Sequence, residues 1–460
     1  MPTVINSNLN RTTVDILNAI RNSATANYRN YVPTADNNIT SIHNIGSVIM
    51  DYAAIRNEFL SALINRIGLV LVKSRLYRNP WSAFKKGELA FGETVEEIFV
   101  NIAQPFSFDP QTAESNVFKR NIPDVRSAFH VMNYQKFYKH TVSREQLRQA
   151  FLTIEGVTDL IAKIVEAMYS GANYDEFLTM KYMLARHILA GHFYPVAIPT
   201  VIPENTKRIA SIMKATSTDM SFMKTKYNIA GVENYADTEN QYIIMTSDFV
   251  GDMDVEVLAS AFNLSYADFL ARRVMIDGFG ELDTNRLNKL FTRQDGTYEE
   301  GYTPLTADEL TALSSIPAVL VDKDFFMIFD NLTETTDNFN GEGLYFNYWL
   351  HVWKTFSVSP FSNACVFIGG TPSVTSVTVT PSTATLPAVV GAGIQLTADV
   401  VTVNFASKAV TWSTSNENVT VDNYGKVTIT GSQIPASVTI TATSVFDDSK
   451  TGTATITIEA

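Results

Sequence analysis

Alternation of β-branched residues with other side chains marks the C-terminal part of the chain. It appears in six short runs: VTSVTVTP, IQLTADV, KAVTWSTS, GKVTITG, ASVTITATS and GTATITIEA. Each run is bounded by Gly, Pro, Asn or Asp, which favour turns. A period of two places alternate side chains on one face of a strand. The pattern therefore predicts an antiparallel β-sandwich, with one face of each strand in the core.

A cluster of turn-forming residues, Gly369-Gly370-Thr371-Pro372, precedes these runs. Upstream of it the sequence is mixed and rich in Phe, Tyr, Asn and Arg, whereas Thr, Val, Ala and Ser dominate downstream. A Gly/Pro cluster at such a change of composition indicates a hinge. We predict one part of the protein in residues 1–370 and a separate all-β domain in residues 371–460.

Helical periodicity dominates two regions upstream of the hinge. The first contains TTVDILNAIRNSA and YAAIRNEFLSALINRIG, in which Ile55, Phe59, Leu63 and Ile67 recur every four residues. That spacing places their side chains on one face of a helix. Gly68 is predicted to end this helix before the apolar run LVLV.

The second helical region begins at Ser143 and has the longest pattern, SREQLRQAFLTIEGVTDLIAKIVEAMYSG followed by YDEFLTMKYMLARHILAG. Ser143 is a predicted N-cap, with Glu145 and Gln146 in the first turn. Gly171 and Gly191 are predicted to end the two helices.

The remaining segments upstream of the hinge are extended or mixed. Residues 77–120 contain many Gly and Pro residues and few apolar runs, which predicts an extended hairpin or arm. After Pro195 we expect a strand in QYIIMTSDF, a capped helix in MDVEVLASAFN and a polar excursion over 280–302, whose role stays open. Two aromatic runs, AVLVDKDFFMIFDNL and LYFNYWLHVWKTFSVSPFSNACVFIG, are predicted to close a sheet. The upstream part is thus of the α+β class.

Composition places the chain among globular proteins. It has 460 residues, 45% hydrophobic and 18% charged, which is enough for two or three folding units. No apolar run approaches the ~20 residues of a membrane-spanning helix. The start MPTVINSNLNRTTVDIL lacks the basic and apolar regions of a secretory signal, so we expect none.

Charge and cysteine content exclude further classes. A net charge of −12 disfavours a protein that grips DNA, because such affinity comes largely from Lys and Arg. Cys365 is the only cysteine, which rules out an internal disulfide and a multi-thiolate metal cluster. This fits assembly in a reducing cytoplasm. Because Cys365 lies in an apolar run, we interpret it as a buried core thiol.

Acidic clusters offer weak candidates for chemistry. The sequence SDFVGDMD places Asp248, Asp252 and Asp254 together, but the Gly and final Glu of a calcium loop are missing. We interpret these residues as caps of the following helix. The pairs Glu96-Glu97 and Asp322/Asp324 could act as general acid and base only in a suitable pocket, so we interpret them as solvated or ion-paired.

Histidine spacing and motif searches indicate no catalytic, cofactor or metal site. His187 and His192 are five residues apart, and His130 and His140 are ten apart, so neither pair has the i, i+4 spacing of HExxH. They are interpreted as packing or surface histidines. Walker, GxGxxG and GxSxG motifs are absent from the sequence.

The order of helices, arm, long helix, mixed region and closing strands resembles the Hong Kong 97-type capsid fold. More specifically, residues 1–370 resemble the major capsid proteins of phi-29-like short-tailed phages. The resemblance is carried by DILNAIRNS, LINRIGLVLV, FKKGELAFGETVEEIF, LASAFNLSYADFL, VMIDGF, AVLVDKDFFMIFDNL and YWLHVWKTFSVSPFSNACVF. It implies an N-terminal arm with helices (1–70), an extended loop (71–135), a peripheral domain with the long helix (136–200 and 320–370) and an axial domain (201–319).

The all-β domain resembles the bacterial immunoglobulin-like group 2 family. The resemblance is carried by Trp412 with the following STSN, by YGKVT from Tyr424, and by Gly391 and Leu396 of a Gly-x-x-x-x-Leu pattern. It makes Trp412 a candidate core residue of this sandwich.

The capsid resemblance implies a shell of hexamers and pentamers, icosahedral or prolate, built in the host cytoplasm around scaffolding protein. A portal would occupy one vertex, and packaged double-stranded DNA would be a partner by proximity only. The arm would lie over a neighbouring subunit, with Lys85, Lys86, Glu96 and Glu97 as candidate inter-subunit contacts. In some capsids an arm lysine forms a covalent cross-link, but no acceptor is identified here, so we expect charge pairs.

The immunoglobulin-like domain is expected on the outer surface of the virion, where it would bind host cell-surface glycans or clamp neighbouring capsomers. Two other functions stay open. A phage tail protein or cell-surface adhesin could carry such a module, although we find neither a signal sequence nor heptad repeats. A polysaccharide-cleaving enzyme with a binding module would need paired carboxylates in a pocket within the first 370 residues.

Overall fold

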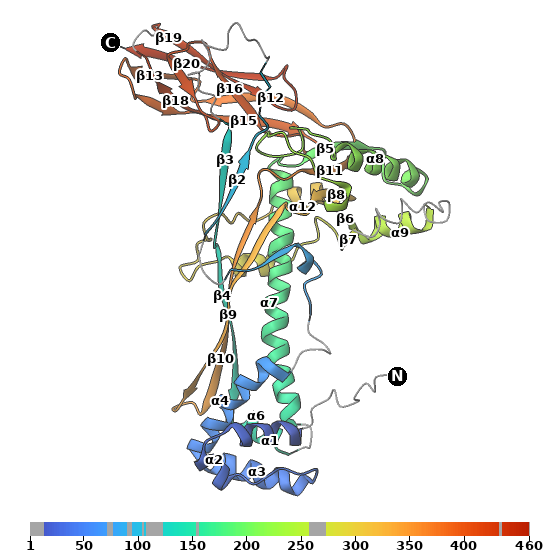
Figure 1. The fold of residues 1–460 in the computed structure, drawn as a ribbon, viewed down its shortest axis with the longest axis vertical. Coiled ribbons are helices and arrows are strands. Elements are labelled where there is room, and N and C mark those ends of the chain that lie inside the picture. Colours follow the sequence, from blue (N-terminus) through green and yellow to red (C-terminus); the bar gives the residue numbers. More distant parts are fainter. Residues whose placement is uncertain are drawn as a thin grey trace. The chain divides into compact units, whose positions relative to one another are not determined.

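The computed structural model describes residues 13–70, 77–89, 94–103, 105–106, 123–152, 156–256, 273–431 and 435–459 (Figure 1). The chain divides into two compact units. Unit 1 comprises Met1–Thr94, Val131–Phe177 and Ile328–Phe356, and unit 2 comprises Val95–His130, Leu178–Met327 and Ser357–Ala460.

Unit 1 begins with helices whose apolar side chains recur every three or four residues. These helices are α1 (Thr13–Ser23), α2 (Ala26–Tyr31), α3 (Ile39–Asp51) and α4 (Ala53–Val70). In α3, for example, Ile42, Ile45 and Ile49 are buried, and Asn38 caps its first turn. The spacing buries one face of α1 and of α3. The predicted positions Leu63 and Ile67 of α4 lie outside the residues whose side chains are described.

The described part of unit 1 also contains a four-stranded sheet in the order β1-β9-β10-β4. Its strands are β1 (Lys85–Glu88), β4 (Tyr134–Ser143), β9 (Phe326–Asn340) and β10 (Tyr345–Val358), and the short 3₁₀ helix η1 (Ser82–Phe84) precedes β1. β1 runs parallel to β9, and β10 runs antiparallel to β4 with Tyr345 opposite Ser143. Strands β9 and β10 each extend by a few residues into unit 2.

Ser143 links the sheet to the helix α6 (Arg144–Ala150) and is the N-cap that the sequence predicts. Its hydroxyl accepts a hydrogen bond from the backbone N–H of Gln146, whose side chain in turn accepts from the backbone of Ser143. This reciprocal arrangement is a capping box.

Two glycines do not end helices, contrary to prediction. α4 continues through Gly68 to Val70, and α7 (Gly156–Leu189) continues through Gly171. A single glycine costs a helix interior only about 1 kcal/mol relative to alanine, so neighbouring interactions override it. Gly191 does mark a helix end, because it adopts a left-handed φ of 75° just after Leu189.

Unit 2 contains a mixed five-stranded sheet in its described residues, in the order β5-β11-β8-β6-β7. The strands are β5 (Tyr194–Ile198), β6 (Gln241–Thr246), β7 (Arg273–Ile276), β8 (Ala318–Asp322) and β11 (Ala364–Gly369). β8 is buried along its whole length, as the apolar run AVLV predicts. Cys365 lies in the core of this sheet, and its burial raises the pKa of the thiol above its ordinary value.

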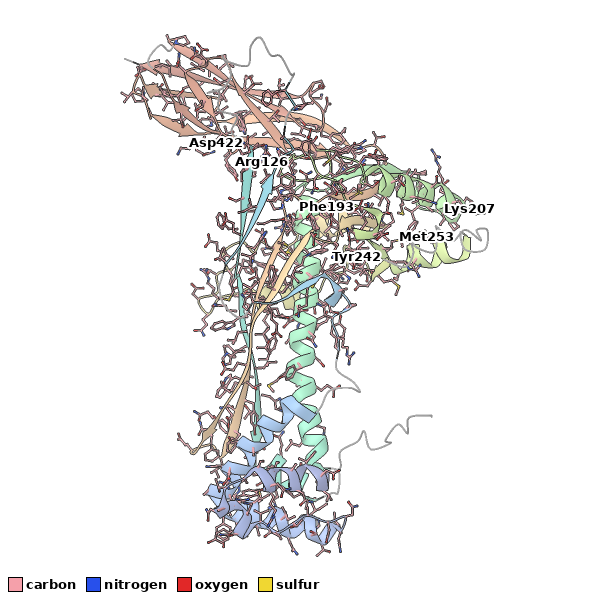
Figure 2. The ribbon with its side chains drawn as sticks, viewed as in Figure 1. Arg126, Phe193, Lys207, Tyr242, Met253 and Asp422 are labelled. Atoms are coloured by element: carbon pink, nitrogen blue, oxygen red, sulfur yellow. The ribbon has the colours of Figure 1, made fainter. Side chains whose placement is uncertain are left out.

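Helices α8 (Thr206–Asp219) and α9 (Ser247–Glu256) supply core residues beside this sheet, including Met253 of α9 (Figure 2). The predicted capping role of Asp252 and Asp254 is wrong, because both residues lie inside α9. The helix starts earlier because the hydroxyl of Thr246 accepts a hydrogen bond from the N–H of Phe249. The predicted continuation of this helix to Asn263 lies outside the described residues.

The excursion over residues 280–302 is ordered around an aromatic cluster. It contains helix α11 (Thr284–Leu290), and helix α12 (Ala307–Ser314) follows it. Tyr302 stacks on Phe291 with ring centroids 4.7 Å apart, and it lies 4.9 Å from the ring of Tyr182 in α7. The polar composition of residues 280–302 therefore gave no indication that their aromatic side chains pack together.

Residues 373–459 form the all-β part that the alternating pattern predicts. Its strands are β12 (Ser373–Thr380), β13 (Thr383–Pro387), β14 (Gly393–Gln395), β15 (Thr397–Val403), β16 (Val410–Thr414), β17 (Val419–Val421), β18 (Lys426–Ile429), β19 (Ser437–Ser444) and β20 (Thr451–Glu459). Their inward side chains form one hydrophobic cluster. The antiparallel prediction fails for one pair, since β13 runs parallel to β20. β13 and β17 were not predicted at all.

Candidate functional site

Strands β2 (Thr94–Val100) and β3 (Val125–Val131) form a two-stranded ribbon in unit 2 whose two faces differ. Along β2 exposed and half-buried residues alternate, and β3 has the same pattern around the buried His130. The backbone N–H of Asn101 donates to the carbonyl oxygen of Asp124 at 3.0 Å, which closes the ribbon beyond β2. A period of two therefore gives the ribbon an inner and an outer face.

Polar side chains fasten the inner face to the rest of unit 2. His130 is 2% exposed, and its two ring nitrogens lie 2.8 Å from the Ser357 hydroxyl and 3.1 Å from Oε2 of Glu97. The hydroxyl of Ser359 donates to Oε1 of Glu97 at 2.8 Å. Such a connected network holds the ribbon more firmly than separate contacts would.

Two further residues of the inner face contribute contacts. The ring of Phe99 stacks on Phe361 with centroids 5.4 Å apart. Arg126, labelled in Figure 2, donates from Nη1 to the backbone oxygen of Ala230 at 2.6 Å. The inner face is thus held at several points along its length.

The outer face of the ribbon carries large apolar side chains that remain exposed. Their exposed fractions are 60% for Ile98, 55% for Val100, 52% for Val125, 61% for Phe129 and 53% for Val131. The outer face of the ribbon is therefore mostly apolar, apart from the exposed Glu96.

A network of ion pairs and hydrogen bonds connects the start of the predicted arm to other elements of unit 1. Nζ of Lys85 lies 2.5 Å from Oδ2 of Asp330 and 3.3 Å from Oε2 of Glu176. Lys354 pairs with the same two carboxylates, and its Nζ lies 2.5 Å from Oδ1 of Asp330. The amide of Asn79 donates to Oε1 of Glu176 at 2.6 Å. The network therefore joins η1 and β1 to α7, β9 and β10.

Attraction between the lysine ammonium groups and the carboxylates shifts the pKa values in this network. Burial alone would lower the pKa of Lys85, but its hydrogen bonds and attraction to Asp330 and Glu176 raise it above the ordinary value. Burial alone would raise the pKa of Asp330, but the two ammonium groups of Lys354 and Lys85 hold it below the usual range. Both shifts favour the charged forms, so each ion stabilises the other.

The structure separates the predicted contact residues rather than gathering them. Lys85 is engaged within its own chain, and Lys86 is half-buried beside it. Glu97 faces inward, whereas Glu96 lies exposed on the outer face of the ribbon. Contact of these residues with a neighbouring copy stays a prediction. Trp412 is partly buried and packs against the core of the all-β part.

The histidine pair of unit 2 is closer than its spacing suggested. Nδ1 of His187 lies 2.7 Å from Nδ1 of His192, so one nitrogen donates and the other accepts. Burial and the neighbouring His192 lower the pKa of His187 to about 4. Among the described residues, no group of three or more His, Cys, Asp or Glu side chains is arranged to hold a metal ion.

Sequence reasoning gave no role to Glu176, Asp330 and Lys354, and it interpreted His130 only as a packing or surface histidine. A usable signal existed for Glu176, because it directly precedes the largely apolar helical stretch FLTMKYML. A charge in that position is seldom left without a partner. For Asp330 and Lys354 the sequence pattern offers no such signal, whereas His130 stands between the apolar residues Phe129 and Val131.

The described helices include none that is both long and apolar enough to cross a membrane. The backbone N–H of Asp324 donates to Oδ1 of Asp322 at 3.0 Å, so this carboxylate is engaged in the turn.

Comparison with known proteins shows the family of this chain. The family model described as Phi29-like phage major capsid protein matches residues 17–368. The chain belongs to the Phi29-like phage major capsid protein family. The match ends one residue before Gly369, so the all-β part lies beyond the matched residues.

Individual members of the Phi29-like family are similar over most of the chain. The major capsid protein of Bacillus phage B103 is 36% identical over 378 residues, covering 81% of this chain and 77% of that protein. The major capsid protein of Bacillus phage GA-1 is 34% identical over 427 residues, covering 91% and 83%. A chain of the capsid structure of Staphylococcus phage Andhra shares the fold, with a TM-score of 0.51 at 15% identity over 65% of this chain and 87% of that chain.

Membership of the Phi29-like family establishes the function as that of a phage major capsid protein, and the tail or adhesion alternative is not supported. Capsid proteins assemble with copies of themselves into the virion shell. The family is one of structural proteins, in line with the expectation of no catalytic role.

Proposed function

We propose that the β2–β3 ribbon is an assembly element, whose apolar outer face docks on a neighbouring copy in the shell. The supporting observation is the contrast between its faces, because the inner face is held by buried polar contacts while five large apolar side chains stay exposed outside. Covering a half-exposed side chain of this size contributes roughly 1 kcal/mol. Repeated over every subunit, contacts of this size stabilise a shell.

We further propose that the shell consists of hexamers and pentamers, assembled in the host cytoplasm around scaffolding protein with a portal at one vertex. Packaged double-stranded DNA would be a partner by proximity only, which the net charge of −12 supports. The fold would be of the Hong Kong 97 type, with residues 1–70 as arm and helices, 71–135 as extended loop, 136–200 and 320–370 as peripheral domain, and 201–319 as axial domain. The long helix α7 and the likeness to the Andhra capsid support this proposal.

For residues 371–460 we propose an immunoglobulin-like domain on the outer surface of the virion. Its short strands, its hydrophobic cluster and the packing of Trp412 support the proposal. It would bind host cell-surface glycans or clamp neighbouring capsomers. Deleting Pro372–Ala460 separates these roles, because shells that fail to form would make the domain structural, and shells that form but bind cells poorly would support glycan binding.

Replacing two apolar residues of the outer face tests the role of the ribbon. The variant Ile98→Ser/Phe129→Ser is co-expressed with scaffolding protein, and shells are counted by negative-stain microscopy and sedimentation. We expect a folded chain that forms few shells. Tyr424→Ser is the control, because it removes another exposed aromatic side chain, 86% exposed, from the all-β part. Wild-type yields of shells from the double variant would contradict the proposal.

A further inference from the structure

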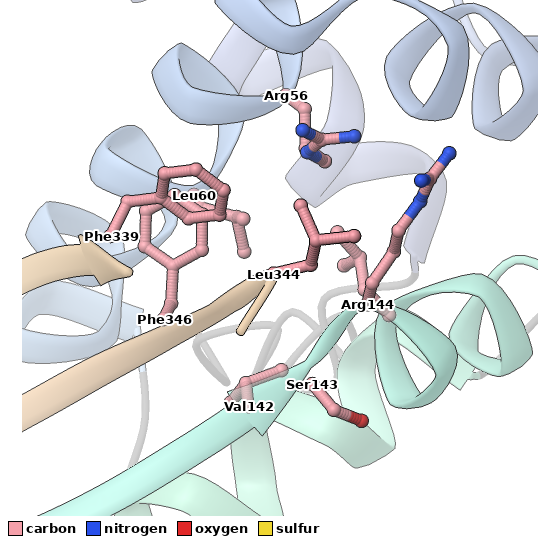
Figure 3. A pocket seen from close by; sticks show the side chains of 9 residues that line it. Arg56, Leu60, Val142, Ser143, Arg144, Phe339, Leu344 and Phe346 are labelled. Carbon is pink, nitrogen blue, oxygen red and sulfur yellow. The ribbon is translucent and has the colours of Figure 1, made fainter. Parts of the chain in front are cut away.

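A shallow, open pocket lies in unit 1, lined by residues of α4, α6 and the ends of β4, β9 and β10 (Figure 3). Its walls are largely apolar and include Leu60, Phe339, Leu344 and Phe346. Two cationic side chains also line it, Arg56 and Arg144, and Figure 3 shows both guanidinium groups beside Leu344. None of the networks described above includes these residues.

Arg56 is a buried cation that has no counter-charge among the described residues. The residue is only 7% exposed, and its guanidinium donates to the backbone oxygen of Met50 at 3.3 Å and lies 5.8 Å from the ring centroid of Phe339. Burial, with the nearby Arg144, lowers its pKa below the ordinary value. Among the residues that the structure describes, no carboxylate lies within ion-pair distance of Arg56 or Arg144.

An arginine side chain has five N–H donors and is almost never buried unless it is paired. Arg144 is exposed, but its positive charge still repels the buried guanidinium of Arg56. The pocket therefore carries positive charge that no described carboxylate neutralises, and a carboxylate from another molecule would complete an ion pair.

Two local conformational costs coincide at this pocket. Leu344 has a left-handed φ of 52°, which for a large side chain costs of order 1–3 kcal/mol. Arg144 is the first residue of α6, where the helix dipole disfavours a cation. The two residues are joined, since the N–H of Arg144 donates to the carbonyl of Leu344 at 3.3 Å. Costs of this kind concentrate at functional sites.

Glu96 has the complementary chemistry. It lies exposed on the outer face of the ribbon, on the same strand as the apolar Ile98, and no hydrogen bond or ion pair to it is found among the described residues. An acid among apolar side chains matches two cations among apolar walls. Duplex DNA matches the pocket poorly, because phosphate binding uses many Lys and Arg on an open surface.

We propose that the Arg56–Arg144 pocket binds the carboxylate of Glu96 from a second copy of this chain. The inference rests on the proposed docking of the ribbon and names the place where its acidic residue would bind. A bidentate pair between guanidinium and carboxylate would also fix the register between the two copies.

The first test compares shell yields of three variants expressed with scaffolding protein. Arg56→Met and Arg144→Gln are expected to lower the yield of shells at least about tenfold, because the lost contact recurs in every subunit. Arg148→Gln is the matched control, because Arg148 is an exposed residue of α6 that does not line the pocket. Equal yields from all variants would overturn the inference while leaving the ribbon proposal intact, whereas wild-type yields from Ile98→Ser/Phe129→Ser would overturn the ribbon proposal itself.

The free chain distinguishes this binding role from a structural one. Removing an unpaired buried charge by Arg56→Met should leave the melting temperature unchanged or raise it, whereas a structural arginine would lower it. Sodium glutarate, at matched ionic strength, should raise the melting temperature of the wild type but not of Arg144→Gln. A stronger effect from sodium phosphate would contradict the choice of a carboxylate.

A double-mutant cycle tests Glu96 as the partner. Glu96→Gln alone should lower the shell yield as much as Arg144→Gln does, and the double variant should lose no more than either single variant. Additive losses would show that Glu96 and Arg144 act independently, and would overturn the pairing.

Discussion

Nε2 of His130 in β3 lies 3.1 Å from Oε2 of Glu97 in β2, and this contact links the two strands of the ribbon through their side chains. His130 is buried, and its other ring nitrogen contacts Ser357. The ribbon thus has its inner face fixed before any neighbour arrives. A fixed surface loses less conformational entropy on docking than a mobile one.

Replacing His130 should loosen the ribbon without unfolding the protein. His130→Leu keeps an apolar volume but leaves Glu97 and Ser357 without their partner, at a local cost of about 1–3 kcal/mol. Hydrogen exchange of Thr94–Val100 should therefore become faster, while that of β8 stays unchanged. Glu96→Gln, on the opposite face, serves as the control and should not alter exchange in the free chain. Equal protection in the histidine variant would show that the ribbon is held by other contacts.

Neutralising Glu176 should destabilise unit 1. This 3% exposed side chain receives hydrogen bonds from Asn79, Lys85 and Lys354, so Glu176→Gln leaves two lysines to share Asp330. Breaking a buried pair in this way costs about 3–5 kcal/mol. Urea unfolding measures the loss. Glu166→Gln is the same substitution at an exposed position of α7 and should change the free energy of unfolding by less than about 0.5 kcal/mol.

The histidine pair should make unit 2 less stable in mild acid. The unfolded chain binds a proton at His187 near pH 6.5, whereas the folded chain does so only near pH 4. Stability that is present above pH 6.5 is therefore lost as the pH falls towards 4. Between about pH 7.5 and about pH 5 we expect a loss of about 2 kcal/mol from this group. His187→Gln should lose correspondingly less, and an equal loss in both proteins would assign the effect to other groups.

Replacing two glycines of the all-β part by alanine should distinguish the cost of backbone strain alone from the cost of strain with a steric clash. Gly425 has a φ of 82°, and an added Cβ would meet the carbonyl of Leu396 and lie 2.9 Å from Cζ2 of Trp412. Gly391 has a φ of 94° with nothing within 4 Å of such a Cβ. Gly391→Ala should therefore cost about 1 kcal/mol from strain alone, and Gly425→Ala several-fold more. Similar melting temperatures for the two variants would contradict the packing of Trp412 against this turn.

Local patterns predicted those elements whose structure depends on near neighbours along the chain. The alternating runs after Gly370 form strands, Ser143 caps α6, and Gly191 follows the end of α7. Gly68 and Gly171 misled the prediction because the glycine penalty is small compared with the interactions that extend a helix.

Local sequence patterns could not predict the contacts of the candidate site. Glu96 and Glu97 are adjacent and chemically identical, yet one faces outward and the other bonds to His130. Lys85 pairs with residues 91 and 245 positions away, at Glu176 and Asp330. Nothing near Arg56 in the sequence indicates that its guanidinium shares a pocket with Arg144.

The sequence by itself determined the class of protein, the all-β end and most helices and strands, because periodicity, caps and turn residues act over a few positions. Only the tertiary structure decided which charges are paired, which face of the ribbon is fixed and which cations lack a partner. Those outcomes depend on segments far apart in the chain, whose contacts are set by burial and register rather than by local propensity.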